Sequence, residues 1–289
     1  MLATAPTRNR NNRYGFGLPI QTRIPPPPSA AGARRDSKPQ AASAMPASIE
    51  EDDPMLDYPP EDWISSMIGT RGLLYRFSDS LVYKTNITPR EADLIEAAGD
   101  LTLKLRTRVL WKGSRSPAGT KAVIIDHGRR FMPPDVAPDK RKAVVLEMFL
   151  LLDKLHNQHG IVHGDIRASK FLWGRDGRLK LVDYGSAKFI TEDPKSWNAC
   201  HATETHFTSM RARRPRDSGN KVDRIPPPTV FDDYYALAVT IWTMFTGKVP
   251  GSHQFNTRSV KRSDLAKVDD DQIRRWIRKV FKMAGCIFL

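Results

Sequence analysis

The residue types best suited to chemistry lie in one stretch near the middle of the chain. Asp165 follows a short apolar run within His163-Gly164-Asp165, and Asp183 follows another within Asp183-Tyr184-Gly185. Phosphoryl transfer needs one carboxylate to orient and deprotonate the attacking hydroxyl and a second to hold Mg²⁺ on the phosphates. Two aspartates on neighbouring loops fit these roles, although an aspartate in a loop is more often a turn or cap residue.

Ahead of this stretch, the hydrophobic pattern predicts a small sheet with one helix. Thr88 and Pro89, with Glu91 three residues past the cap, start a helix that Gly99 ends. Short apolar runs on either side of this helix predict strands. The expected strands span residues 72–77, 81–83, 108–111 and 122–125.

Beyond residue 128 the pattern becomes mainly helical. A strand is expected at residues 161–163. A hairpin is expected around Asp176-Gly177, because Asp-Gly is a strong turn signal between apolar runs. The expected helices span residues 139–159, 232–246 and 270–284. The pattern therefore predicts an α+β chain whose two aspartates follow short strands in its second half.

The order of these pieces resembles the catalytic loop and metal-binding motif of eukaryotic protein kinases. Lys84, at the end of the strand at 81–83, is similar to the strand lysine that pairs with nucleotide phosphates, and Glu91 to its ion-pair partner. Asp233 is similar to the aspartate of a central helix that bonds to the catalytic-loop backbone. The sequence segments at residues 161–165 and 231–233 resemble those of the small, divergent kinase-like proteins common in fungi.

The resemblance implies a two-lobed protein-kinase-like fold with a small antiparallel sheet and one helix in the N-lobe, near residues 63–127. A mainly α-helical C-lobe would span about 128–289, and ATP with Mg²⁺ would lie between the lobes. It also implies transfer of the terminal phosphoryl group to a Ser or Thr hydroxyl. Asp165 would be the base and Asp183 the metal ligand. Lys84, Glu91 and the two glycines of a glycine-rich loop, Gly69 and Gly72, would bind the nucleotide.

The chain departs from this pattern at the position where the family has a metal-ligating asparagine. Lys170 stands there, and an ammonium group has no lone pair for Mg²⁺. Lys170 either neutralises phosphate charge itself, leaving one metal on Asp183, or marks a site that has lost transfer. Arg167 replaces the lysine that contacts the transferred phosphate and can bind phosphate with a different reach.

These departures leave two alternatives to a Ser/Thr kinase. Lys170 and the glycine loop, which keeps two glycines, favour a pseudokinase that binds nucleotide or partners without turnover. Gly164, which replaces an arginine that senses a phosphorylated activation loop in many kinases, also resembles aminoglycoside phosphotransferase-like kinases. A small-molecule phosphotransferase is therefore the third reading.

The composition of the chain restricts the class of protein and its location. The chain has 289 residues, 40% of them hydrophobic, and a net charge of +14 that attracts phosphate of any kind. Its two cysteines are too few for a disulfide scaffold, and no apolar run is long enough for a membrane span. We therefore expect an intracellular protein, cytoplasmic or nuclear. The kinase-like domain is expected at residues 61–289.

The remaining features favour ordinary interpretations. Residues 1–60 read as a basic, proline-rich disordered tail, with an organelle presequence as the alternative. The arginines of residues 211–216 lack interleaved aromatics, so we expect a solvated loop and no nucleic-acid partner. A metal site on His156, His159 and His163 is disfavoured because no carboxylate or thiolate completes the set.

Overall fold

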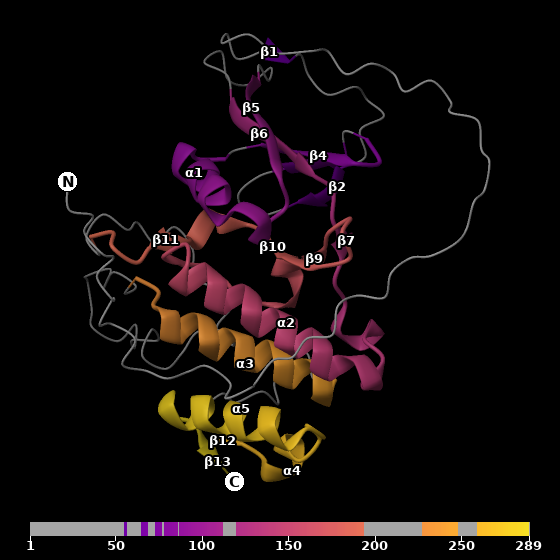
Figure 1. Cartoon of the computed structure of the whole chain (residues 1–289), viewed down its shortest axis with the longest axis vertical. Helices are drawn as coiled ribbons and strands as arrows, with labels where there is room; N and C mark the ends of the chain where they lie inside the picture. Colours follow the sequence, from indigo (N-terminus) through magenta and orange to yellow (C-terminus); the bar gives the residue numbers. More distant parts are fainter. Residues whose placement is uncertain are drawn as a thin grey trace, which may run out of the picture.

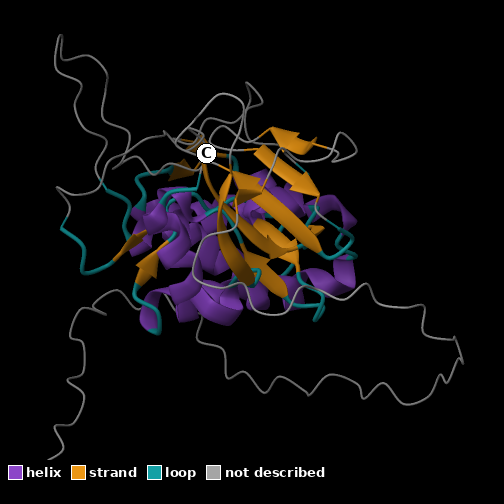
Figure 2. Ribbon diagram, turned by 90° about the horizontal axis from the view of Figure 1, so that it is seen from above, coloured by secondary structure: helices purple, strands orange, loops and turns teal. Residues whose placement is uncertain are grey.

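The computed structural model describes residues 55–56, 65–68, 73–76, 78–85, 87–111, 120–193, 227–247 and 259–288. A sheet with one helix lies against a larger, mainly helical part (Figure 1). Seen from above, the strands cover the helices (Figure 2). This arrangement is the two-lobed α+β fold that the sequence predicted.

The N-lobe sheet has six strands in the order β1-β5-β6-β4-β3-β2. All neighbours are antiparallel except β1, which pairs in parallel with β5. Lys84 lies on β4 in register with Leu74 on one side and Val123 on the other. A central strand thus carries this lysine. The strands are β1 (Met55–Leu56), β2 (Ser65–Ile68), β3 (Leu73–Arg76), β4 (Leu81–Thr85), β5 (Leu105–Trp111) and β6 (Thr120–Asp126).

Helix α1 (Pro89–Ala98) begins and ends where its cap residues predict. The Thr88 hydroxyl accepts a hydrogen bond from the Glu91 backbone N–H at 3.0 Å, and Pro89 occupies the first turn. Gly99 ends the helix with a φ of 57° and starts a short 3-10 helix, η1 (Gly99–Leu101). The Glu91 side chain is buried and takes no part in the cap. Its carboxylate instead accepts a hydrogen bond from Lys84 Nζ.

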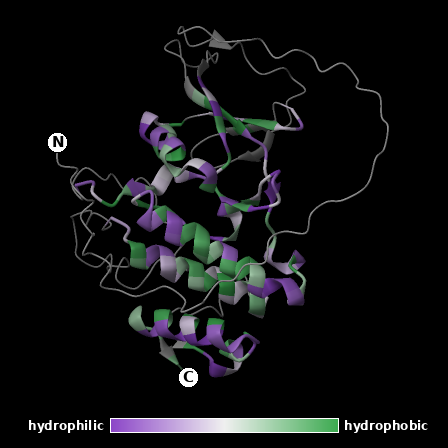
Figure 3. Ribbon diagram, viewed as in Figure 1, coloured by the Kyte–Doolittle hydropathy of each residue, from purple (hydrophilic) through white to green (hydrophobic). Residues whose placement is uncertain are grey.

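Three long helices form the C-lobe. Helix α3 (Val230–Thr246) is apolar nearly throughout, as Figure 3 shows, and begins at a capping box of Thr229 and Asp232. Helix α5 (Asp271–Met283) packs one apolar face inward, with the Trp276 ring 4.4 Å from that of Phe149. The other helices are α2 (Pro138–Asn157) and the short α4 (Arg262–Leu265).

Short strands and 3-10 turns connect these helices and surround the segment that holds Asp165 and Asp183. The hairpin of β9 and β10 pairs on one side with β7, while β8 pairs with β11, so the loops that follow β8 and β10 are brought together. None of the described helices combines the length and apolarity needed to cross a bilayer. The remaining elements are β7 (Arg129–Arg130), β8 (Ile161–Val162), β9 (Phe171–Trp173), β10 (Leu179–Leu181), β11 (Lys188–Phe189), β12 (Ser259–Val260), β13 (Ile287–Phe288), η2 (Pro133–Asp135), η3 (Ala168–Lys170) and η4 (Tyr184–Ser186).

Candidate active site

Asp233 on α3 anchors the loop that carries Asp165. Its side chain is 1% exposed, and its two carboxylate oxygens accept hydrogen bonds from the backbone N–H groups of His163 at 2.7 Å and Gly164 at 2.8 Å. His156 on α2 lies 2.9 Å from the same carboxylate through Nε2. A buried carboxylate is tolerated where such donors replace water. The bonds to this loop match what the family resemblance implied for Asp233.

His163 joins the two loops of the reactive stretch. The ring is fully buried and donates from Nε2 to the Val182 carbonyl at 3.1 Å, while Nδ1 accepts from the Asp165 backbone N–H at 3.3 Å. Burial lowers the pKa of this imidazole. The neutral ring supplies the one donor and one acceptor that these contacts need. The residue before Asp183 is thereby tied to the loop of Asp165.

Gly164 lets the two loops approach closely. Its φ is 76°, in the left-handed region where side chains are disfavoured. A Cβ at this position would lie 2.6 Å from the Ser186 carbonyl oxygen and 2.9 Å from Cγ of Pro228. Both the backbone angle and the packing therefore require glycine here, so an arginine could not be accommodated without moving the neighbouring chain.

Asp183 receives two ammonium groups from different parts of the fold. Its Oδ1 accepts from Lys84 Nζ at 3.0 Å, and its Oδ2 accepts from Lys170 Nζ. Lys84 Nζ also donates to Glu91 on α1 at 2.6 Å. The N-lobe helix is thus linked through Lys84 of the N-lobe strand to Asp183 of the C-lobe loops.

The contacts continue from Asp183 to Asp165. Lys170 Nζ lies 3.2 Å from Asp165 Oδ2, and the Arg167 guanidinium lies 3.4 Å from the same oxygen. The other oxygen of Asp165, Oδ1, is buried and has no hydrogen-bond partner among the described residues. Six side chains from both lobes therefore alternate in charge along one series of contacts, and the region that they line is called the cleft below. In order of contact they are Glu91, Lys84, Asp183, Lys170, Asp165 and Arg167.

These contacts determine the charge states of Lys84 and Asp183. Burial alone would lower the pKa of Lys84, but the carboxylates of Asp183 and Glu91 outweigh it and raise that pKa. Burial would raise the pKa of Asp183, but the ammonium groups of Lys84 and Lys170 hold it well below the ordinary aspartate value. Both groups are therefore charged at neutral pH.

Two contacts that were not expected from the sequence hold α1 in place. Arg90, next to Glu91, pairs with Glu192 of the segment that follows β11, at 2.5 Å. His159, just after α2, donates from Nδ1 to the Ala97 carbonyl at 2.6 Å. Neither contact has a sequence signal, because the partners are far apart along the chain. The histidines considered for a metal site thus bond to separate groups: His156 to Asp233, His159 to Ala97 and His163 to Val182.

Of the predicted site residues, the six charged side chains converge, whereas Gly69 and Gly72 lie outside the described residues. The donor set fits a two-metal site poorly. Lys170 offers no lone pair, and both oxygens of Asp183 already accept from ammonium groups. Within the described ranges, no three His, Cys, Asp or Glu side chains are grouped to hold a metal.

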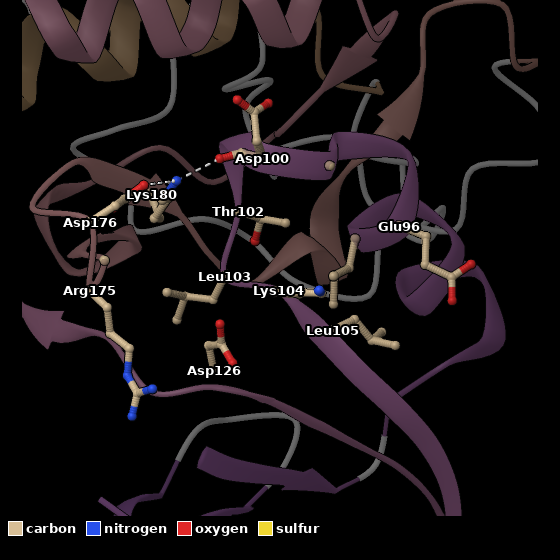
Figure 4. A pocket seen from close by; sticks show the side chains of 13 residues that line it. Glu96, Asp100, Thr102, Leu103, Lys104, Leu105, Asp126, Arg175, Asp176 and Lys180 are labelled. Carbon is tan, nitrogen blue, oxygen red and sulfur yellow. Dashed lines mark hydrogen bonds and ion pairs between the residues drawn. The ribbon is translucent and has the colours of Figure 1, made fainter. Parts of the chain in front are cut away.

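A separate pocket lies beside the end of α1, η1 and the turn between β9 and β10 (Figure 4). None of the six charged cleft residues lines it. Lys180 crosses from the hairpin to donate to the Asp100 carbonyl at 2.8 Å and pairs with Asp176 at 2.9 Å, as the dashed lines in Figure 4 show. We interpret this region as a contact between the two lobes, separate from the group of six charged side chains.

Comparison with known proteins places these features in a family. A sequence model described as the protein kinase domain matches residues 130–280, which is more than half of the chain. A probable serine/threonine-protein kinase PknB of Lactococcus lactis is 28% identical over 115 residues, covering 40% of this chain and 17% of that protein. A probable serine/threonine-protein kinase ireA of Dictyostelium discoideum is 28% identical over 139 residues, covering 48% of this chain and 13% of that protein.

The solved structure of the Cydia pomonella granulovirus kinase PK-1 is similar in fold. It matches with a TM-score of 0.50 at 15% identity, covering 73% of this chain and 82% of that chain. The matches to the bacterial and amoebal proteins span less than a fifth of the length of each of them. The likeness to these curated relatives is thus confined to one part of them.

Proposed function

The chain belongs to the protein kinase domain family, and on that premise we propose that it binds ATP between its lobes and transfers the terminal phosphoryl group to a Ser or Thr hydroxyl. One observation carries the proposal: Lys84, Asp183 and Asp165, from distant parts of the sequence, are linked through contacts in one cleft. The serine/threonine kinases among the relatives support the class of acceptor.

The charged side chains have distinct roles in this proposal. Lys84, held by Glu91, and Arg167 supply positive charge for the phosphates, which repel an incoming nucleophile when unneutralised. Asp165 offers Oδ1, which has no hydrogen-bond partner in the part of the chain that the structure describes, to the hydroxyl of the substrate. The hydroxyl oxygen bonds to the terminal phosphorus, the bond to the bridging oxygen breaks, ADP leaves, and the proton passes to Asp165.

Transfer of labelled phosphate from ATP to a generic basic protein substrate, or to the chain itself, tests this proposal. We expect Asp165→Ala to lower the rate by about 10²- to 10⁴-fold, the usual contribution of a positioned base. Asp139→Ala is the matched control, because Asp139 is exposed at the start of α2. Equal rates for wild type and Asp165→Ala would contradict the role of Asp165.

A second candidate function, nucleotide binding without transfer, is favoured by one specific contact. Lys170 holds both Asp165 and Asp183, so the base and the nucleotide-side carboxylate share an ammonium group. If this pairing persists with nucleotide bound, the Lys170 ammonium keeps Asp165 Oδ2 from the acceptor hydroxyl. Stabilisation of the full chain by ATP in a thermal unfolding experiment, with no transferred label, would identify this case.

A further inference from the structure

Lys170 occupies the space between the two carboxylates of the cleft. Its Nζ lies 3.2 Å from Asp165 Oδ2 and donates to Asp183 Oδ2. The side chain is only 10% exposed, so it cannot exchange these partners for water without moving. Paired carboxylates of this kind need a cation between them, because two unpaired negative charges repel each other strongly at short range. Here that cation is part of the chain.

The charges of the cleft also balance without a metal. The carboxylates of Glu91, Asp183 and Asp165 are matched by Lys84, Lys170 and Arg167, and the formal charges cancel. With asparagine at position 170 the same group would carry a net negative charge and would attract a divalent ion. With lysine, an ion at Asp183 would meet two ammonium groups that already use both carboxylate oxygens.

A nucleoside triphosphate brings the negative charge that these cations can accept. Two ammonium groups and one guanidinium lie at these carboxylates, and each is a group that can form charge-assisted hydrogen bonds with phosphate oxygens. Such bonds give the phosphates the neutralisation that a metal gives in other sites.

We propose that the Lys170 ammonium replaces a metal ion in this cleft, so that the protein binds the phosphates of a nucleoside triphosphate without a divalent cation. This inference rests on the proposed function, because it presumes that the cleft takes a nucleotide. It concerns binding, and it holds for either a kinase or a nucleotide-binding protein without turnover.

Titration calorimetry of the full chain with the β,γ-imido analogue of ATP tests the inference. The titration is run with excess magnesium chloride and, separately, with excess EDTA. For wild type we expect dissociation constants that agree within about threefold between the two conditions. For Lys170→Asn we expect binding in EDTA to weaken by at least about tenfold and to recover with magnesium, because one positive charge is lost and an amide oxygen is gained.

Lys170→Arg is the control, since it keeps the charge and should keep binding in EDTA within about tenfold of wild type. Wild-type binding that is at least about tenfold tighter with magnesium would overturn the inference while leaving the proposed function intact. Binding in neither condition would overturn both. If Lys170→Asn fails to fold, the wild-type comparison alone decides the question.

Discussion

Replacing Asp233 by alanine tests how strongly α3 holds the loop that carries Asp165. Asp233 lies at the start of α3, and its carboxylate accepts from two consecutive backbone N–H groups of the loop that carries Asp165. Alanine removes both acceptors and also the partner of His156 Nε2. Since the site is 1% exposed, water cannot easily replace the lost contacts.

The expected loss of stability follows from these contacts. A buried donor left without a partner costs about 1–3 kcal/mol, and Asp233→Ala leaves the backbone N–H groups of His163 and Gly164 without their acceptor. We therefore expect Asp233→Ala to reduce the free energy of unfolding by about 2–6 kcal/mol, the sum for these two donors. Asp233→Asn keeps one acceptor oxygen but turns an amide donor toward another donor, so an intermediate loss of about 1–3 kcal/mol is expected.

Urea unfolding followed by circular dichroism measures these differences. The matched control is Asp232→Ala, one residue earlier on the same helix. Asp232 completes the capping box with Thr229, and loss of that cap should cost about 1 kcal/mol. If Asp233→Ala were no more destabilising than Asp232→Ala, Asp233 would not be the anchor of the loop.

Two further predictions concern the same loop. Gly164→Ala should destabilise the fold by about 2–4 kcal/mol, whereas the control Gly177→Ala should cost about 1 kcal/mol. The two glycines have similar positive φ, but of the two only Gly164 has neighbours within contact distance of an added Cβ. Equal losses of stability in urea unfolding would show that this close packing at Gly164 does not matter. His163, whose pKa is lowered by burial, stays neutral in the folded chain while the unfolded chain takes up a proton below about pH 6.5. Its contribution to stability is therefore present above that pH and lost as the pH falls. In urea unfolding between about pH 7 and pH 5, His163→Gln should flatten the decline in stability, and an unchanged slope would refute the assignment.

Local signals were sufficient for the long elements. The helix at α1 was predicted from Thr88, Pro89 and Gly99, and the structure begins and ends it at those residues. The helices at α2, α3 and α5 also agree within about two residues, because each combines an apolar pattern with a clear end. Strand β4 extends beyond its predicted end to include Lys84, since pairing with β6 continues to Thr85.

Several of the two-residue strands had no local signal. Two-residue strands such as β7, β11 and β12 contain too few positions to show alternation, and each exists only because a distant segment pairs with it. The same reason hid the contacts of Arg90 with Glu192 and of His159 with Ala97. These contacts depend on tertiary structure, which spacing along one chain does not encode.

The position of the Lys170 side chain could not be predicted from the sequence motif. Its identity alone indicated that the second metal ligand was missing, because an ammonium group has no lone pair. The motif could not show where the ammonium would go. It was equally compatible with a lysine turned to solvent, which would leave Asp165 and Asp183 unneutralised. The contacts to both carboxylates distinguish these cases.

The backbone of Asp183 indicates that the cleft sets the position of this residue. Among the described residues other than glycine, it alone has a positive φ, at 70°. A left-handed aspartate is tolerated, but it persists only where the surroundings hold it. Here Lys84 and Lys170 hold opposite oxygens of the carboxylate, and the bond from His163 to the Val182 carbonyl fixes the residue before it. Strain and charge neutralisation thus coincide at the carboxylate where the two lobes meet, which is where a nucleotide phosphate would have to displace or share an ammonium group.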